Sequence, residues 1–238
     1  MDTIVLVDHT RAYRPEPGVL DAIAEALTIQ IERDFAPAWG SRVRRVKVGG
    51  RGDKIHFFDH AHQATDYGWH IVDNHGAPYA HVFAGVSITH NGSWTLGSDA
   101  ISVTASHEVL EMLGDPAANE YCFNGQRTLW SREVCDAVQA NSYSIVAGGK
   151  RVAVSNFVLP AFFNPWAPAP YDHLGILTAP FSIATGGYAV VESAAPTRER
   201  AARKLEVRFD QAVPEWQRAE KLGGWGRTYW RQVISASS

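Results

Sequence analysis

Residues 98–116 read SDAISVTASHEVLEMLGDP, and this stretch has the marks of a single helix. Ser98 or Asp99 can cap its first free amides, and Gly114 with Pro116 is typical of a helix end. Apolar side chains recur between these signals and predict that the helix is largely buried. They are Ile101, Val109, Leu110, Met112 and Leu113.

Three polar side chains interrupt this apolar helix. His107 and Glu111 are one turn apart and project from the same face, while Glu108 lies about 100° around the axis. An imidazole and carboxylates are costly to bury unless something neutralises them, and a divalent cation would do so. The alternative is a packed core histidine, with both glutamates on a solvated side of the helix.

The spacing resembles the His-Glu-x-x-His motif of the zincin metallopeptidases, with Glu111 in place of the second histidine. The resemblance is gluzincin-like in particular. It implies that His107 and Glu111 are metal ligands and that Glu108 is the general base. A carboxylate binds zinc at about the same distance as an imidazole, but it donates more charge and should weaken the Lewis acidity of the metal.

A catalytic zinc site needs at least three protein ligands, so the resemblance calls for another one downstream. In gluzincins it is a glutamate on a following segment, with an aspartate shortly after it. Here Glu133 and Asp136 stand in the segment SREVCD. The resemblance implies Glu133 as third ligand and Asp136 as the residue that steadies His107, and their roles are exchangeable. The alternative is a surface Glu and Asp in a short helix.

The combined pattern Ser-His-Glu-x-x-Glu, Asp-Pro and Glu-Val-x-Asp is also similar to little-characterised bacterial proteins and to plant EXORDIUM-like secreted proteins. What is shared there is the motif rather than the whole chain. Asp115 is another partner for His107 by spacing. An Asp-Pro pair that ends a helix is more often turn chemistry, and we interpret it so.

Composition sets the broad class. With 238 residues, 45% hydrophobic and 20% charged, the chain fits one globular domain or two lobes that share a core. A net charge of −3 argues against nucleic acid or an anionic membrane as a partner, and no apolar run approaches membrane-spanning length. The acidic N-terminus does not read as a secretory signal, so we expect a cytoplasmic location. Cys122 and Cys135 are expected to be free buried thiols rather than a single bridge.

Local patterns predict an amphipathic helix over 19–35 and a hairpin turn at Asn91-Gly92 before the motif helix. Strands are expected over 3–7, 41–48, 54–58 and 78–84. The predicted fold class is α+β and zincin-like, with a mixed or antiparallel sheet over the active-site helix. Residues 1–116 would form the N-terminal lobe, and residues 117–238 a smaller lobe that supplies the third ligand and a wall of the cleft.

In zincins an edge strand above the active-site helix pairs with the extended substrate, and the resemblance gives the strand at Tyr79–Ala84 that role. The implied substrate-binding residues are Tyr79, Ala80, His81 and Val82. Upstream, Asp59-His60-Ala61-His62 is a candidate second metal site, and the alternative is a polar loop that happens to be rich in histidine.

The predicted function is a metal-dependent hydrolase, a zinc peptidase acting on a peptide or protein substrate. Zinc is favoured over Mn²⁺ or Ca²⁺, although oxygen ligands also suit those harder cations. Five side chains are available as oxyanion donors: Tyr121, Tyr143, Tyr171, His173 and Tyr188. One alternative is a binding or structural protein on a zincin scaffold, whose metal orders the fold. A metal-free glycosidase that pairs Glu108 with Glu111 or Asp115 ranks last.

Overall fold

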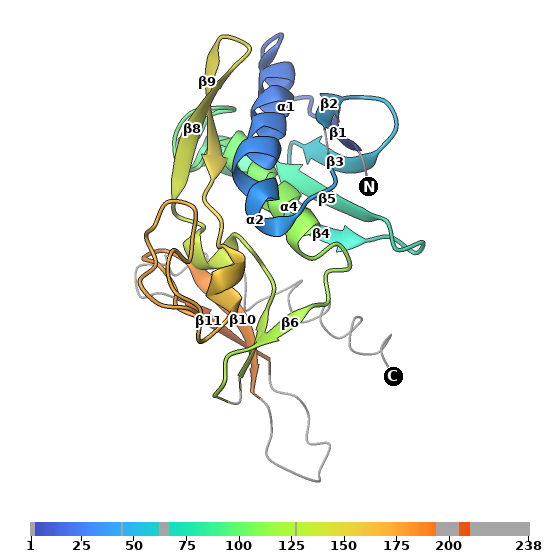
Figure 1. The fold of residues 1–238 in the computed structure, drawn as a ribbon. Helices are drawn as coiled ribbons and strands as arrows, with labels where there is room; N and C mark the ends of the chain where they lie inside the picture. Colours follow the sequence, from blue (N-terminus) through green and yellow to red (C-terminus); the bar gives the residue numbers. More distant parts are fainter. Residues whose placement is uncertain (1–2, 44, 62–66, 127, 194–204, 210–238) are drawn as a thin grey trace.

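The computed structural model describes residues 3–43, 45–61, 67–126, 128–193 and 205–209. Within these ranges the architecture is mixed α+β, with a five-stranded sheet, a four-stranded sheet, a two-stranded hairpin and few helices (Figure 1). Helices α1 (Val19–Ile29) and α4 (Ile101–Gly114) lie between the five-stranded sheet and the hairpin. None of the helices in the described ranges has both the length and the apolar character needed to cross a bilayer.

The five-stranded sheet has the order β2-β1-β3-β5-β4. Its strands are β1 (Thr3–Asp8), β2 (Arg45–Val48), β3 (Asp53–Phe58), β4 (Gly68–Val72) and β5 (Pro78–Phe83). The pairings β1 with β2, β1 with β3 and β3 with β5 are parallel, whereas β4 runs antiparallel to β5. The predicted mixed sheet is therefore confirmed. Alternate residues such as Ile55, Phe57, Ala80 and Val82 enter the core, as the two-residue period of a strand requires.

The predicted edge position of the strand at Tyr79–Ala84 is wrong. β5 lies between β3 and β4 and pairs with both, and Tyr79, Ala80, His81 and Val82 each have a register partner on either side. A strand with both neighbours in place cannot add a substrate strand. At this end of the sheet the last strand is β4, which the sequence patterns did not predict.

The helix expected over 19–35 is longer than predicted. After α1 the chain continues as a π-helical segment (Gln30–Phe35) and then as α2 (Ala36–Trp39). Pro37 does not end the helix, because a proline is tolerated in the first turn, where its missing N–H leaves no bond unmade. Gly40 ends it in the left-handed region, with φ 69°.

Two further expectations about the approach to the motif helix are wrong. α4 begins at Ile101, and no side chain caps it. The predicted hairpin is also absent from this segment, because residues 84–89 form the short helix α3 (Ala84–Thr89). Asn91 does adopt the left-handed conformation that an Asn-Gly pair favours, with φ 64°, but it follows a helix.

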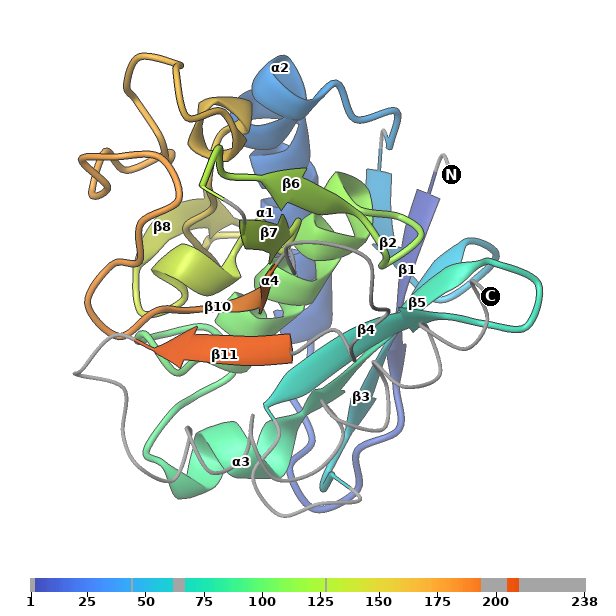
Figure 2. The same ribbon diagram turned by 90° about the horizontal axis from the view of Figure 1, so that it is seen from below.

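The second half of the chain contributes an antiparallel sheet and a hairpin. The sheet has the order β11-β10-β7-β6, and Figure 2 shows β11 and β6 at its two ends. Its strands are β6 (Tyr121–Phe123), β7 (Thr128–Ser131), β10 (Tyr188–Ser193) and β11 (Leu205–Phe209). Strands β8 (Ser142–Ala147) and β9 (Lys150–Ser155) form the hairpin, which packs on α1 and α4. Two 3-10 turns complete this half: Asp136–Val138 and Pro160–Phe163.

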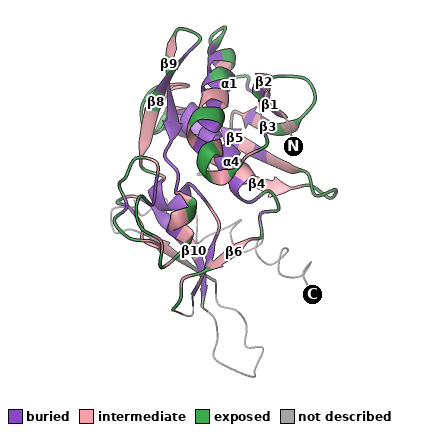
Figure 3. Cartoon of the chain, viewed as in Figure 1, coloured by how far each residue is buried: buried purple, intermediate pink, exposed green. Residues whose placement is uncertain are grey.

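One hydrophobic cluster unites the two halves. It contains Leu6 and Ile23 from the first half together with Val152 and Phe157 from the second. α4 runs through this interior, and Figure 3 shows most of it buried. Cys122 and Cys135 are unbridged thiols, as predicted, but only Cys135 is buried, whereas Cys122 is half-buried.

Candidate metal centre

Serine hydroxyls fix the rotation of α4 about its axis. Ser102 Oγ donates a 2.6 Å hydrogen bond to the carbonyl oxygen of Ala153 on β9. Ser106 Oγ donates to Gln30 Oε1 at 2.7 Å and accepts from the amide of Ser155 at 3.0 Å. All of these groups except Ala153 are fully buried. Because one side of the helix is committed to β9 and to the π-helical segment after α1, the side chains of the motif are directed toward β4 and toward the segment that begins at Glu133.

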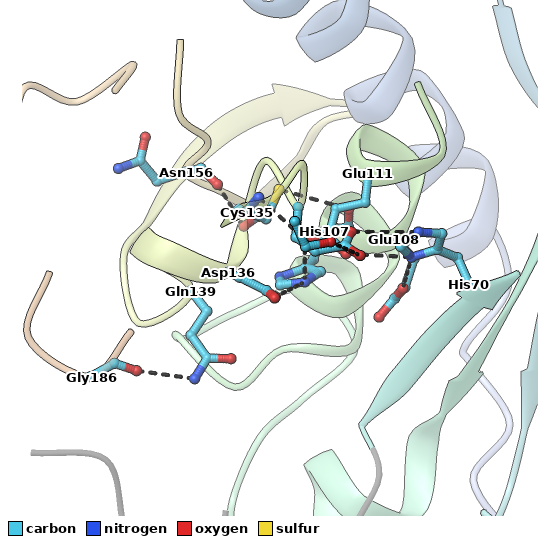
Figure 4. A network of polar contacts seen from close by, with 12 residues as sticks. His70, His107, Glu108, Glu111, Cys135, Asp136, Gln139, Asn156 and Gly186 are labelled. Atoms are coloured by element: carbon cyan, nitrogen blue, oxygen red, sulfur yellow. Dashed lines mark hydrogen bonds and ion pairs between the residues drawn. The ribbon is translucent and has the colours of Figure 1, made fainter. Parts of the chain in front are cut away.

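The motif histidine contacts two carboxylates through one nitrogen. His107 Nε2 lies 3.1 Å from Glu111 Oε1, one helical turn away, and 3.3 Å from Asp136 Oδ1 (Figure 4). The side chains of Glu111 and Asp136 are 4% and 5% exposed, and that of His107 is 14% exposed. Two acids from segments distant in sequence therefore meet one imidazole in the interior.

The segment Glu133–Asp136 is held on α4 by close packing. Gly114 lies so close to Val134 that a Cβ at this position would come within 2.5 Å of Val134 Cγ1. The amide of Cys135 donates to Glu111 Oε1 at 3.3 Å, and its thiol contacts the His107 carbonyl oxygen at 3.7 Å. The glycine at the end of the helix thus allows the approach that brings Asp136 to His107.

A second imidazole, which the sequence analysis did not single out, enters the site from β4. His70 Nδ1 lies 3.2 Å from Glu108 Oε2 and 3.4 Å from Glu111 Oε2 (Figure 4). Its Nε2 lies 3.6 Å from Glu133 Oε2. Its side chain is only 8% exposed. Gly68 makes this approach possible, because a Cβ there would lie 2.9 Å from Glu108 Oε1 and 2.7 Å from Thr104 Cγ2.

The sequence did not indicate His70 as a site residue, because its strand lacks a clear alternation of apolar and polar residues. All five residues of β4 are half-buried, so the sequence GWHIV lacks the alternation that marks a strand with one solvated face. A glycine followed by Trp, Ile and Val does favour a strand, and could have drawn attention to the histidine between them.

The structure brings the predicted residues together, but Glu133 contacts His70 and not His107. Glu133, the predicted third ligand, makes its ion pair with His70, while Asp136 is the acid beside His107. Ser131 Oγ also donates to Glu133 Oε1 at 3.3 Å. Which of the two acids is the ligand stays a prediction, and the geometry favours Asp136.

Two other sequence candidates have local structural roles. Asp115 Oδ2 accepts the amide of Glu120 at 2.6 Å, which is the turn chemistry predicted for it. Asp59 accepts the amides of residues 11–13, so its carboxylate is committed to a loop. His62, also part of that proposed second metal site, lies outside the described residues.

The electrostatics of the site show how much negative charge is confined in it. Burial alone would raise the pKa of Glu111, but His107 and His70 hold it well below its ordinary value. Burial and the nearby Glu111 raise the pKa of Glu133 to about 8. Burial opposes protonation of both imidazoles, yet the surrounding carboxylates raise the pKa of His70 and of His107 well above 6.5. Both imidazoles are therefore favoured in their protonated, positively charged form beside the four acids Glu108, Glu111, Glu133 and Asp136.

The donor set fits a divalent cation. Ligands of one tetrahedral zinc ion, each about 2.1 Å from it, lie about 3.4 Å from each other. The distances from His107 Nε2 to its two carboxylates, 3.1 and 3.3 Å, are close to that value. In addition, His70 Nε2 and Glu133 Oε2 are buried without a hydrogen bond, which is rare for polar atoms and is often explained by an ion.

Two more side chains border the site. The Cys135 sulfur forms a compact group of possible ligand atoms with His107 and Glu111, all within 4.8 Å of one another. Burial and Glu111 raise the pKa of this thiol well above its ordinary value, so the neutral thiol is a poorer ligand than the Asp136 carboxylate. The Tyr188 hydroxyl from β10 hydrogen-bonds Asp136, and burial raises its pKa well above 10.

Of the other possible oxyanion donors, two have their hydroxyl groups engaged elsewhere. Tyr143 donates to Asp34 at 2.7 Å and Tyr171 donates to the Ala167 carbonyl at 3.0 Å. His173 stacks on Phe157. Tyr188 is thus the candidate that stands next to a predicted ligand.

No protein-family model, curated protein or solved structure matches this chain, so its function has to be inferred from the side chains of the site.

Proposed function

We propose that this protein is a metal-dependent hydrolase, zincin-like in its active-site helix, that cleaves peptide bonds. One observation carries the proposal: His107 Nε2 contacts both Glu111, one turn along the same helix, and Asp136, from a distant segment, in a buried place. Buried charges in proteins are paired or bind metals, and this group has more acids than imidazoles.

The ligands of the cation would be His107, Glu111 and Asp136, with the Cys135 sulfur beside them. A divalent cation in such a site supplies Lewis acidity, which polarises a carbonyl group and makes water easier to deprotonate. Zinc fits best, because a mixed nitrogen and oxygen set with a sulfur neighbour suits it better than Ca²⁺ or Mn²⁺.

Glu108 is the residue proposed to accept the proton of the attacking water and to return it to the leaving amine. It follows His107 directly, its carboxylate is nearly buried, and His70 Nδ1 at 3.2 Å orients it. Tyr188 is proposed as the oxyanion donor, with its single hydroxyl proton passing from Asp136 to the oxyanion once Asp136 binds the cation. The role of the substrate-pairing strand passes from β5 to β4, the last strand of the sheet order.

A second candidate is a binding or structural protein whose metal orders the fold without catalysis. The observation that favours it is burial, since the side chains of His107 and Glu133 are only 14% and 13% exposed. A structural metal site is closed, whereas a catalytic one keeps a position open to substrate.

The experiment combines metal analysis with cleavage of a peptide library by purified protein. We expect bound zinc and cleavage in the wild type, and in His107→Ala one equivalent less zinc and no cleavage. Glu108→Gln should keep the zinc beside His107 and lose cleavage by roughly 100-fold or more, because general base catalysis contributes about 10²–10⁴-fold. His75→Ala, which alters an exposed turn, is the matched control.

The outcomes separate the candidates. Zinc without cleavage of any peptide would favour the structural protein. Wild-type protein without zinc, or cleavage that survives in His107→Ala, would contradict the hydrolase.

A further inference from the structure

The site contains two groups of possible ligand atoms rather than one. His107, Glu111 and Cys135 form the first group, and His70, Glu108 and Glu111 form the second, with each group's atoms within 4.8 Å of one another. Glu111 belongs to both. Its Oε1 lies 3.1 Å from His107 Nε2, and its Oε2 lies 3.4 Å from His70 Nδ1. One carboxylate thus presents its two oxygens to two different histidines.

The side chains in this place offer more ligand atoms than one cation uses. Four acids meet here: Glu108, Glu111, Glu133 and Asp136. They surround the imidazoles of His70 and His107. Four carboxylates with two histidines is the donor set of dinuclear carboxylate centres, where two divalent cations balance it.

His70 enters the site from β4, an element separate from the motif helix. β4 approaches α4 at Gly68, where any side chain would collide with Thr104 and Glu108. The His70 side chain is more than nine-tenths buried, and its Nδ1 is the nitrogen that faces Glu108 Oε2 and Glu111 Oε2, at 3.2 and 3.4 Å. Its Nε2, on the other side of the ring, faces Glu133 Oε2 at 3.6 Å, and a carboxylate in that place is the usual partner of a metal-bound histidine.

We propose that the site binds two divalent cations bridged by the Glu111 carboxylate, one held on the His107 side with Asp136 and one on the His70 side with Glu108, while Glu133 orients the His70 ring. The inference rests on the proposed function and deepens it. Two-cation sites clamp both the attacking and the leaving atom of a hydrolytic displacement. In such a centre Glu108 is a ligand of the second cation instead of the general base of a one-cation site, so its substitution removes a cation as well as a carboxylate.

The number of zinc ions bound at saturation tests the proposal. Metal-free protein is dialysed to equilibrium against Zn²⁺, and bound zinc is measured by mass spectrometry. We expect two equivalents in the wild type and in the control His75→Ala. We expect one equivalent in His70→Ala and one in Glu108→Gln, because both changes remove a ligand of the second cation only.

A measurement on the wild type covers the case in which His70→Ala does not fold. Two Mn²⁺ ions that share a carboxylate are magnetically coupled, so the electron paramagnetic resonance signal per Mn²⁺ should be weaker than that of isolated Mn²⁺. Loading with less than one equivalent should restore the isolated-ion spectrum if the two affinities differ.

Each outcome has a distinct meaning. One equivalent in the wild type, lost in His107→Ala and kept in His70→Ala, overturns the two-cation centre and leaves the hydrolase standing. Two equivalents that persist in His70→Ala, or two uncoupled Mn²⁺ ions, also overturn it, because the second cation then lies elsewhere. Wild-type protein without zinc overturns both proposals.

Discussion

His107 and His70 contact the same glutamate, yet the chain brings them there in different ways. His107 stands on α4 one turn from Glu111, so local helix geometry alone sets their 3.1 Å contact. His70 stands on β4, and its 3.4 Å contact with Glu111 depends on strand pairing and on the approach at Gly68. Residue spacing in the sequence therefore reveals the first imidazole and hides the second.

Substitution of the acids beside the two histidines should have the largest effect on zinc binding and should distinguish the two sides of the site. Asp136→Asn should weaken zinc binding on the His107 side by more than the ~10–100-fold that outer partners of a ligand contribute, since a ligand itself is lost. Glu133→Gln should leave this cation unchanged, because Glu133 pairs with His70. Competition with a chromophoric chelator measures both affinities.

Glu120→Gln is the matched control, since Glu120 is a surface acid paired with Arg132. If Glu133→Gln weakens the tighter zinc more than Asp136→Asn does, then the assignment by resemblance, with Glu133 as third ligand, was right.

Substitution of two glycines should disturb the His107 side and the His70 side of the site separately. Gly114→Ala places a Cβ 2.5 Å from Val134 Cγ1, and Gly68→Ala places one 2.7 Å from Thr104 Cγ2. Each should lower the free energy of unfolding by about 1–3 kcal/mol, the usual cost of overpacking. Urea denaturation measures it, and metal titration should show Gly114→Ala affecting the Asp136 side and Gly68→Ala the His70 side.

A second substitution serves as the control in each case. Val134→Ala should relieve much of the cost of Gly114→Ala, because the colliding atom is a side-chain methyl. Thr104→Ser should relieve less of the cost of Gly68→Ala, because the backbone oxygen of His81 still lies 2.9 Å from the new Cβ. If the changes in the free energy of unfolding of the two single variants simply add in each double variant, then these side-chain contacts are not what makes the glycine substitutions costly.

The metal-free protein should also show a dependence of stability on pH. The pKa of Glu133 rises from 4.5 to about 8 on folding, so between these values the folded state binds more protons than the unfolded state. The raised pKa values of His70 and His107 act in the same direction above 6.5. Stability should therefore fall as pH rises from about 5 to 8, a window set by these shifts.

Thermal unfolding of metal-free protein across this range measures the effect. Saturating zinc should reverse the trend, since ligands bind metal in their deprotonated forms. Glu133→Gln should flatten part of the slope, and a metal-free protein that becomes more stable toward pH 8 would contradict the charge arrangement described for the site.

Local patterns in the sequence predicted the motif helix and most of the sheet beside it. The apolar period of α1 and α4 and the β-branched and aromatic residues of β1, β3 and β5 are local signals, and all five elements were expected. Strand order is not local. The zincin resemblance assigned the edge role to β5, and β4, whose five residues are all half-buried, has no alternating pattern that would extend the sheet beyond it.

The choice of the third ligand also depends on contacts that are not local in the sequence. Glu133 and Asp136 are both within reach of the motif helix by chain length, so spacing alone does not choose between them. The choice depends on Val134 packing against Gly114 and on the 3-10 turn that starts at Asp136. These are tertiary contacts, which no single stretch of sequence encodes.

The glycines that admit close neighbours to α4 also offer a fingerprint for recognising this arrangement elsewhere. Gly68-x-His70 on a strand ahead of the helix, and Glu111-x-x-Gly114 at its end, mark two places at the site where packing leaves no room for a Cβ. A chain that keeps these glycines with both acids can be recognised even where its helix carries a single histidine. One that keeps only the helical motif lacks the geometry that assembles the centre.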